Sequence, residues 1–145
     1  MDHVKKAREL FLEGFNCAQA VFGAFCDVTE IDFEKAILLA SSFGGGIGGM
    51  RQTCGACTGA FMVLGIKKGY SDPKASTEKK EHYKRIQKFA DKFKEKNNTI
   101  ICGELLVGLK AATSNTPENR TDEYYKTRPC LRFVEDAAQI LDEMI

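Results

Sequence analysis

The chain has 145 residues, about the length of one domain, and it can bury a sizeable core without disulfide staples. Its 21 basic and 20 acidic residues nearly balance, which gives no reason to expect a nucleic acid or an anionic membrane as partner. No apolar run reaches the roughly 20 residues of a membrane-spanning helix, and the amino-terminal residues lack the apolar core of a secretion signal. We therefore expect one domain, residues 1–145, in the cytoplasm, with no membrane insertion and no nucleic acid.

Apolar residues recur at helical spacing along most of the chain, and no alternating strand of convincing length is present. The sequence therefore predicts an all-α fold, a compact bundle of about six to seven helices. The first helix is expected to follow Asp2 as its N-cap and to end near Gly14. Asn16 is expected to cap a second helix that ends near Asp27.

A third helix is expected to begin after Asp32 and to end at Gly44 as its C′ residue. Residues 53–66 are apolar or small and contain no proline, which predicts a central, deeply buried helix over residues 53–67. A long charged helix is expected over residues 76–96. Its basic side chains alternate with acidic ones, which favours a solvated face over a nucleic-acid surface.

The remaining chain is expected to form a short helix from Thr99, a polar loop over residues 114–123 and a last helix from Pro129. The two histidines, His3 and His82, are distant from every cysteine in the sequence and are expected on the surface. The pattern therefore gives no support for a Cys-His nucleophilic pair.

The glycine-rich run GGGIGGM precedes the central helix. Gly44, Gly46 and Gly49 fit the spacing G-x-G-x-x-G, but a dinucleotide site needs a strand before it, and here a helix is expected. The run is interpreted as a flexible reversal that lets two helices meet closely. Alternatively, its N–H groups hold a thiolate, a peroxide or another small anion beside Cys54.

Small residues predict a close contact between the second helix and the central one. Gly55 and Gly59 lie four positions apart, and residues 20–24 offer a matching strip. The two helices are therefore expected to cross near Cys17 and Cys54.

The chain has six cysteines, more than packing usually requires, and a reducing cytoplasm argues against a fixed disulfide framework. Four of them fall in the first turn of a predicted helix. There the unpaired N–H groups and the helix dipole favour a negative charge, which lowers the pKa of a thiol. The resulting thiolates can act as nucleophiles or as metal ligands. These residues are Cys17, Cys54, Cys102 and Cys130.

The other two cysteines have different positions. Cys26 is expected near a helix C-terminus, as a buried small apolar residue. Cys57 forms a CxxC with Cys54, a spacing found in thioredoxin-like redox pairs and in zinc knuckles, but no βαβ pattern and no second CxxC accompany it. Glu104 is a candidate proton acceptor because it follows Cys102 by two positions.

The spacing of these cysteines resembles that of the C-GCAxxG-C-C family, whose label records four cysteines and an inferred redox role. The resemblance is carried by Cys17, by GGGIGGM leading into Cys54-Gly55-Ala56-Cys57-Thr58-Gly59, and by CGELL and PCLRFVEDAAQIL. It covers nearly the whole chain. It implies that Cys17, Cys54, Cys102 and Cys130 are the functional set, with Cys57 at a variable position and Cys26 outside the pattern.

The leading hypothesis is a redox-active thiol protein whose four cysteines converge and cycle between dithiol and disulfide. Cys54 would attack, Cys17 or Cys102 would resolve the mixed species, and the loop before Cys130 would move that residue. As an enzyme the protein would be a thiol-disulfide oxidoreductase that needs no cofactor and reacts with a redox partner or a small oxidant.

Two alternatives stay open. The same four cysteines, Cys17, Cys54, Cys102 and Cys130, could bind zinc or an iron-sulfur cluster as metal ligands. The protein could also be a structural or interaction protein whose cysteines only pack in the core. The disulfide pairing and the oligomeric state do not follow from the sequence.

Overall fold

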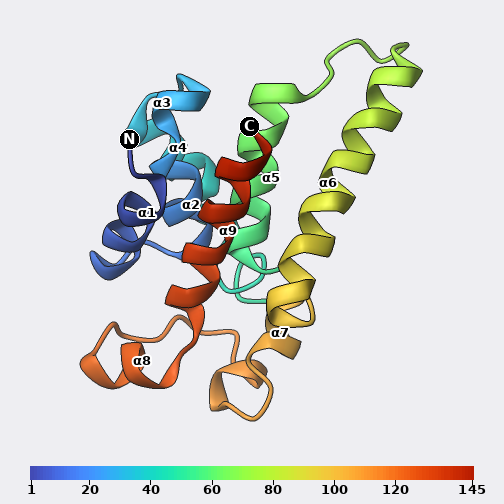
Figure 1. The fold of residues 1–145 in the computed structure, drawn as a ribbon. Coiled ribbons are helices and arrows are strands. Elements are labelled where there is room, and N and C mark those ends of the chain that lie inside the picture. Colours follow the sequence, from blue (N-terminus) through green and yellow to red (C-terminus); the bar gives the residue numbers. More distant parts are fainter.

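The computed structural model describes all 145 residues and is all-α, as expected. Its only β contact is an isolated bridge between Thr53 and Ile101. No helix is both long and apolar enough to cross a membrane. The elements, shown in Figure 1, are α1 (His3–Leu12), α2 (Cys17–Ala24), α3 (Cys26–Thr29), α4 (Phe33–Ala40), η1 (Ser41–Phe43), α5 (Gly55–Lys68), α6 (Ser76–Asn97), α7 (Cys102–Leu105), η2 (Lys110–Thr113), α8 (Asp122–Thr127) and α9 (Cys130–Met144).

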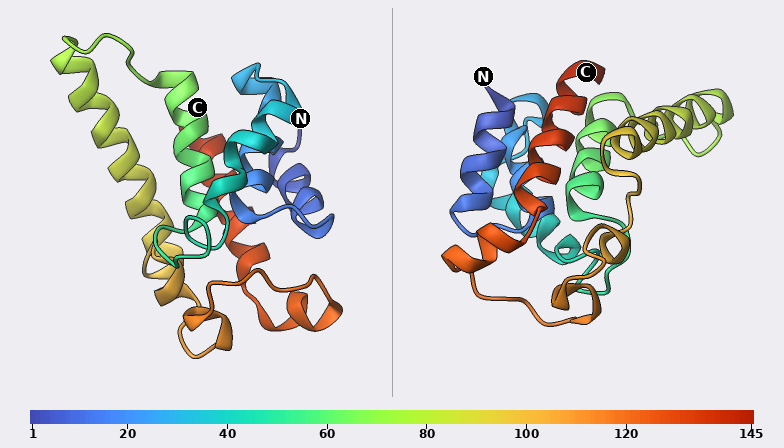
Figure 2. Two further views of the ribbon diagram at one scale, coloured as in Figure 1. Left: turned by 180° about the vertical axis from the view of Figure 1, so that it is seen from behind. Right: turned by 60° about the horizontal axis from the view of Figure 1, so that its bottom comes forward.

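Helix α2 lies at the centre of the bundle and contacts α1, α4, α5 and α9 (Figures 1 and 2). It meets α5 closely because glycines face it. A Cβ added at Gly59 would lie 2.8 Å from the carbonyl oxygen of Ala18, and one added at Gly55 would lie 3.2 Å from Cys17 Cβ. The crossing of these two helices near Cys17 and Cys54 is therefore confirmed.

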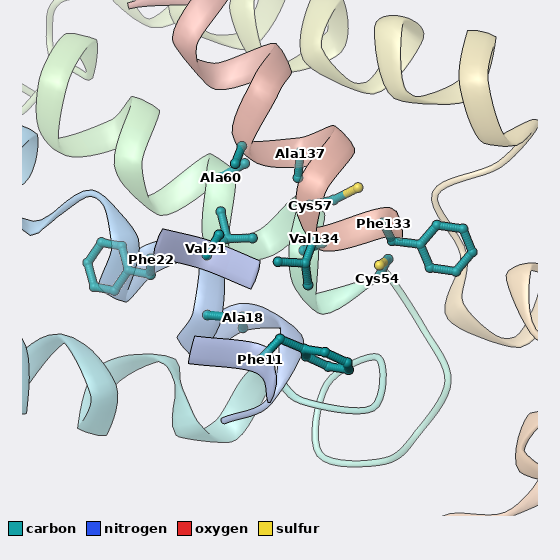
Figure 3. Packing of buried hydrophobic residues seen from close by; sticks show 14 of the residues in the cluster. Phe11, Ala18, Val21, Phe22, Cys54, Cys57, Ala60, Phe133, Val134 and Ala137 are labelled. Atoms are coloured by element: carbon teal, nitrogen blue, oxygen red, sulfur yellow. The ribbon is translucent and has the colours of Figure 1, made fainter. Parts of the chain in front are cut away.

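One hydrophobic core joins the helices. Figure 3 shows Val21 of α2 packed between Ala60 of α5 and Val134 of α9, with Cys54 and Cys57 in the same cluster. Burial of a side chain such as Val21 stabilises the fold by about 1.5–3 kcal/mol. Four of the cysteines are thus part of this core, namely Cys54, Cys57, Cys102 and Cys130.

The expected helix starts at the amino-terminal end are confirmed. Asp2 caps α1, Asp32 caps α4, and Asn16 forms a reciprocal capping box with Gln19 at the start of α2. Gly44, however, is not a left-handed C′ residue, because its φ is −69° and its backbone is extended. It is a glycine because the Asn16 side chain fills the space, 2.6 Å from where a Cβ would be.

The second helix is shorter than expected. It ends at Ala24, and a separate turn, α3, begins at Cys26. The break occurs at Phe25, whose ring is fully buried and stacks on the ring of His3 at 4.0 Å between centroids. Cys26 therefore lies at the start of a short helix, where the sequence predicted a helix C-terminus.

Both histidines are buried, so the expectation that they lie on the surface is wrong. His3 is 2.9 Å from an oxygen of Asp27 and 2.7 Å from one of Asp142. His82 lies 3.0 Å from Arg85, and burial together with this arginine lowers the pKa of His82. These partners were missed because Asp27 and Asp142 are distant from His3 in the sequence.

The carboxyl-terminal third also differs from the prediction. The short helix expected from Thr99 is only the turn Cys102–Leu105, and Thr99 instead accepts a hydrogen bond from the N–H of Ile101. The polar loop ends at Thr121, which caps the additional helix α8. These short turns bring the number of α-helices to nine.

Candidate functional site

A cavity of about 600 Å³ lies at the junction of α2, α5, α7 and α9. Its walls include the glycine run and the loop over residues 115–120. All four cysteines expected at helix starts line it, namely Cys17, Cys54, Cys102 and Cys130. Neither Cys26 nor Cys57 does. The expected convergence of four sulfur atoms is therefore present, and all six cysteines are free thiols.

Reciprocal backbone hydrogen bonds bring Cys54 and Cys102 to the same wall. The N–H of Cys54 donates to the carbonyl of Ile100 at 2.7 Å, and the N–H of Cys102 donates to that of Gln52 at 2.6 Å. Cys54 is the N-cap of α5, one position before the expected first turn. Cys102 is the first residue of α7.

The glycine run forms a tight reversal against this wall. Residues 45–49 all have φ between 55° and 79°, a left-handed conformation that favours glycine, and only Ile47 among them has a side chain. Gly46 also has no space for a side chain, because a Cβ there would lie 2.6 Å from Cys102 Cβ. The reversal therefore closes one side of the cavity against Cys102.

Three arginines line the cavity. Arg51 Nη1 lies 3.6 Å from the sulfur of Cys102. Arg120 donates to the carbonyl oxygens of Phe11 and Phe15 at 2.9 Å each, which fixes its position. Arg128 pairs with Glu118 at 2.6 Å and carries a side chain that is only 8% exposed.

Cys17 and Cys130 line the same cavity and shift each other's pKa in opposite directions. The Cys17 thiol donates a hydrogen bond to Cys130 and lowers the pKa of Cys130 to about 6, with Arg128 and Arg120 also lowering it and burial opposing them. The same hydrogen bond raises the pKa of Cys17 well above its ordinary value, and burial adds to this effect. Cys130 is therefore the member of this pair that loses its proton more readily.

A second pair links Cys54 to Cys57. A hydrogen bond from the Cys57 thiol lowers the pKa of Cys54, and the N–H groups of Ala56 and Cys57 act in the same direction against the effect of burial. Burial raises the pKa of Cys57 well above its ordinary value, and its hydrogen bond to Cys54 adds to this rise. Cys57 is fully buried and points into the core (Figure 3).

A helix start does not by itself make an acidic thiol here. Burial raises the pKa of Cys102 more than Arg51 lowers it, and α7 has only four residues to supply a dipole. Cys17 also has a raised pKa although it begins α2. The expectation of a lowered pKa therefore agrees with Cys54 and Cys130 and is wrong for Cys17 and Cys102.

Most charged residues of the site were not predicted from the sequence. Glu104 is exposed, bonds to Thr99 and does not line the cavity, so it faces no cysteine there. Arg128 could have been identified from the sequence, because it precedes Cys130, the first residue of the last helix, by two positions. Arg51 and Arg120 reach the cavity only through the folding of distant segments.

No group of three or more histidine, cysteine, aspartate or glutamate side chains has an arrangement that could hold a metal ion. The cavity also contains the groups that thiol chemistry requires. Four thiols, two of them with lowered pKa values, lie beside fixed positive charges.

Comparisons with known proteins assign the family. Neither the curated proteins nor the solved structures gave a match. A family model described as "Putative redox-active protein (C_GCAxxG_C_C)" matches residues 15–144. The match spans nearly the whole chain and includes the four cysteines of the cavity. The chain therefore belongs to the C_GCAxxG_C_C family.

Proposed function

We propose that the protein is a thiol-disulfide oxidoreductase in which Cys130 attacks a disulfide and Cys17 completes the exchange. The observation that carries this proposal is that Cys17 and Cys130 line one cavity together with Arg120 and Arg128, and it is supported by the lowering of the pKa of Cys130 to about 6. A thiolate attacks disulfides, whereas a thiol does not.

The reaction balances with a disulfide as the oxidant. The Cys130 thiolate attacks one sulfur of the substrate, the substrate S–S bond breaks, and one thiolate leaves. Cys17 then loses its proton to that leaving thiolate and attacks Cys130 Sγ. A Cys17–Cys130 disulfide forms and the second substrate thiolate leaves, so the substrate gains the two electrons that the two cysteines lose.

We assign the attack to Cys130 in place of Cys54, the residue that the sequence favoured. Both have lowered pKa values, but Arg128 and Arg120 stabilise only the Cys130 thiolate, and its hydrogen-bond donor lines the cavity. The donor to Cys54 is Cys57, which lies in the core. In this proposal Cys54 and Cys102 supply a second dithiol, and a reducing compartment such as the cytoplasm returns the protein to its thiol form.

The test is the identity of the disulfide that forms. Reduced protein, prepared without oxygen, is reacted with one equivalent of a small disulfide, blocked with an alkylating reagent and mapped by mass spectrometry. A Cys17–Cys130 linkage with Cys26 still reduced is expected. Oxidation confined to other cysteines would reject the assignment.

Metal analysis of the same sample distinguishes the metal alternative. One tightly held zinc per chain, or iron with acid-labile sulfide, would make the four cysteines ligands in place of redox thiols. Replacement of all four by serine with a change in stability alone would support a structural role.

A further inference from the structure

The cavity carries more positive charge than thiol exchange alone requires. Among its lining side chains Arg51, Arg120 and Arg128 are basic, and Glu118 is the one acid. The whole chain, by contrast, has a net charge of only +1. The excess of positive charge is therefore a local property of this cavity.

Several hydrogen-bond donors in the cavity have no protein oxygen as partner. Arg128 donates a hydrogen bond from Nη2 to the carboxylate of Glu118, and its other side-chain nitrogens contact no protein oxygen. In the glycine run, the N–H groups of Gly45, Gly46 and Gly48 make no hydrogen bond within the protein, and all three residues line the cavity. Such donors suit the oxygen atoms of an anion.

The size and depth of the cavity limit what can enter. Its volume of about 600 Å³ lies within the range of about 300–1,000 Å³ that holds small molecules. Cys130 is only 7% exposed and Cys54 only 4%. A disulfide on the surface of a folded protein would not reach these sulfur atoms, whereas a small disulfide would.

Glu118 shows where an anionic group binds. Its side chain is 52% exposed, yet its carboxylate lies 2.6 Å from Arg128, which is 8% exposed and also touches Cys130. A carboxylate from solvent can take the place of this exposed one, and Arg128 would then hold it beside the reactive sulfur.

On the basis of the thiol chemistry proposed above, we propose that the substrate is a small disulfide bearing carboxylates. Arg128 binds one carboxylate and the glycine-run N–H groups face the other end. The substrate disulfide then lies at Cys130 and is reduced to two thiols as Cys17 and Cys130 are oxidised.

Three disulfides of similar length test the charge preference: dithiodipropionate is anionic, hydroxyethyl disulfide is neutral and cystamine is cationic. Each rate of oxidation of the reduced protein is divided by the rate of the same disulfide with dithiothreitol, which removes differences in leaving group. The anionic probe is expected to exceed the cationic one by about tenfold or more at low salt. Added salt is expected to reduce this ratio.

Variants test which residues cause the preference for an anionic disulfide. Arg128→Gln is expected to reduce the anionic-to-neutral ratio severalfold, and Glu118→Gln to raise it, because Arg128 then has no resident carboxylate. Arg132→Gln is the control: it removes the same charge from α9 at an exposed position outside the cavity, and the ratio is expected to stay unchanged. Suberate, a dicarboxylate without sulfur, is expected to slow alkylation of Cys130.

The outcomes separate the two proposals. Equal normalised rates for the three probes, with Cys17–Cys130 oxidised in each case, would overturn the anionic substrate class and leave the thiol function standing. Failure of all three probes to oxidise this pair would overturn the thiol function itself.

Discussion

The two cysteine pairs of this protein use the same hydrogen bond in different surroundings. In each pair one thiol donates to the other and lowers its pKa. The Cys17–Cys130 pair lines the cavity beside Arg128 and Arg120, whereas Cys57 of the other pair is fully buried in the core. Under the proposed function, a thiolate needs a reachable partner as well as a lowered pKa to exchange disulfides.

The largest expected effect is on the rate of disulfide reduction. Cys130→Ser should reduce it by more than about a hundredfold, because the change removes the attacking thiolate of the proposed reaction. Cys54→Ser should retain a measurable rate, and Cys26→Ser, outside the cavity, should match the original protein. If Cys54→Ser alone abolished the reaction, the roles of the two pairs would be reversed.

The contact that positions both pairs can be tested by stability. Gly59→Ala places a methyl group 2.8 Å from the carbonyl of Ala18 and should destabilise the reduced protein by about 1–3 kcal/mol, as measured by urea unfolding. Gly65→Ala in the same helix meets no atom within 4 Å and should stabilise it by about 0.5–1 kcal/mol. Equal effects of the two changes would argue against the close approach of α2 and α5.

Arg128, beside the Cys17–Cys130 pair, should account for part of the lowering of the Cys130 pKa. Arg128→Gln is expected to raise the pKa of Cys130 by about one unit, because an adjacent opposite charge lowers the pKa of an anionic group by about 1–3 units. The pH dependence of alkylation measures this shift. Arg132→Gln, at an exposed position on α9 outside the cavity, is the matched control, and a similar shift there would show that the effect is not local.

The smallest effect is expected at the buried pair. Cys57→Ala removes the hydrogen bond to Cys54 and should raise the pKa of Cys54, but by less than about one unit, because the N–H of Ala56 still stabilises the thiolate. Cys57→Ser keeps a donor and should leave the pKa nearly unchanged. A shift as large in the serine variant as in the alanine variant would exclude this hydrogen bond as the cause.

Local chemistry made much of the fold predictable. The caps at Asp2, Asn16 and Asp32 depend on residues within one turn of each helix start, so the sequence contains the whole signal. The contact between α2 and α5 was also predictable from its small residues. The break at Phe25 was not, because it depends on a ring that stacks on His3 from another helix.

The site was predictable in position and only partly in chemistry. The positions of the helix starts indicated that Cys17, Cys54, Cys102 and Cys130 converge, but not which of them pair. The pKa of each thiol depends on which neighbour donates a hydrogen bond to it and on how deeply the sulfur is buried. Arg120, which is held by carbonyls near residues 11–15, is beyond the reach of any local pattern.

The central claim is that Cys130 is a thiolate at neutral pH. A folded-state pKa of about 6, below the ordinary value of 9.0, means that the anion persists above pH 6 and is lost as the pH falls through that value. Alkylation of the reduced protein from pH 4 to 10, with each cysteine quantified by mass spectrometry, measures this directly. We predict a midpoint near pH 6 for Cys130 and one above pH 9 for Cys26, whose pKa is raised by burial. A common midpoint for the two cysteines would contradict the account.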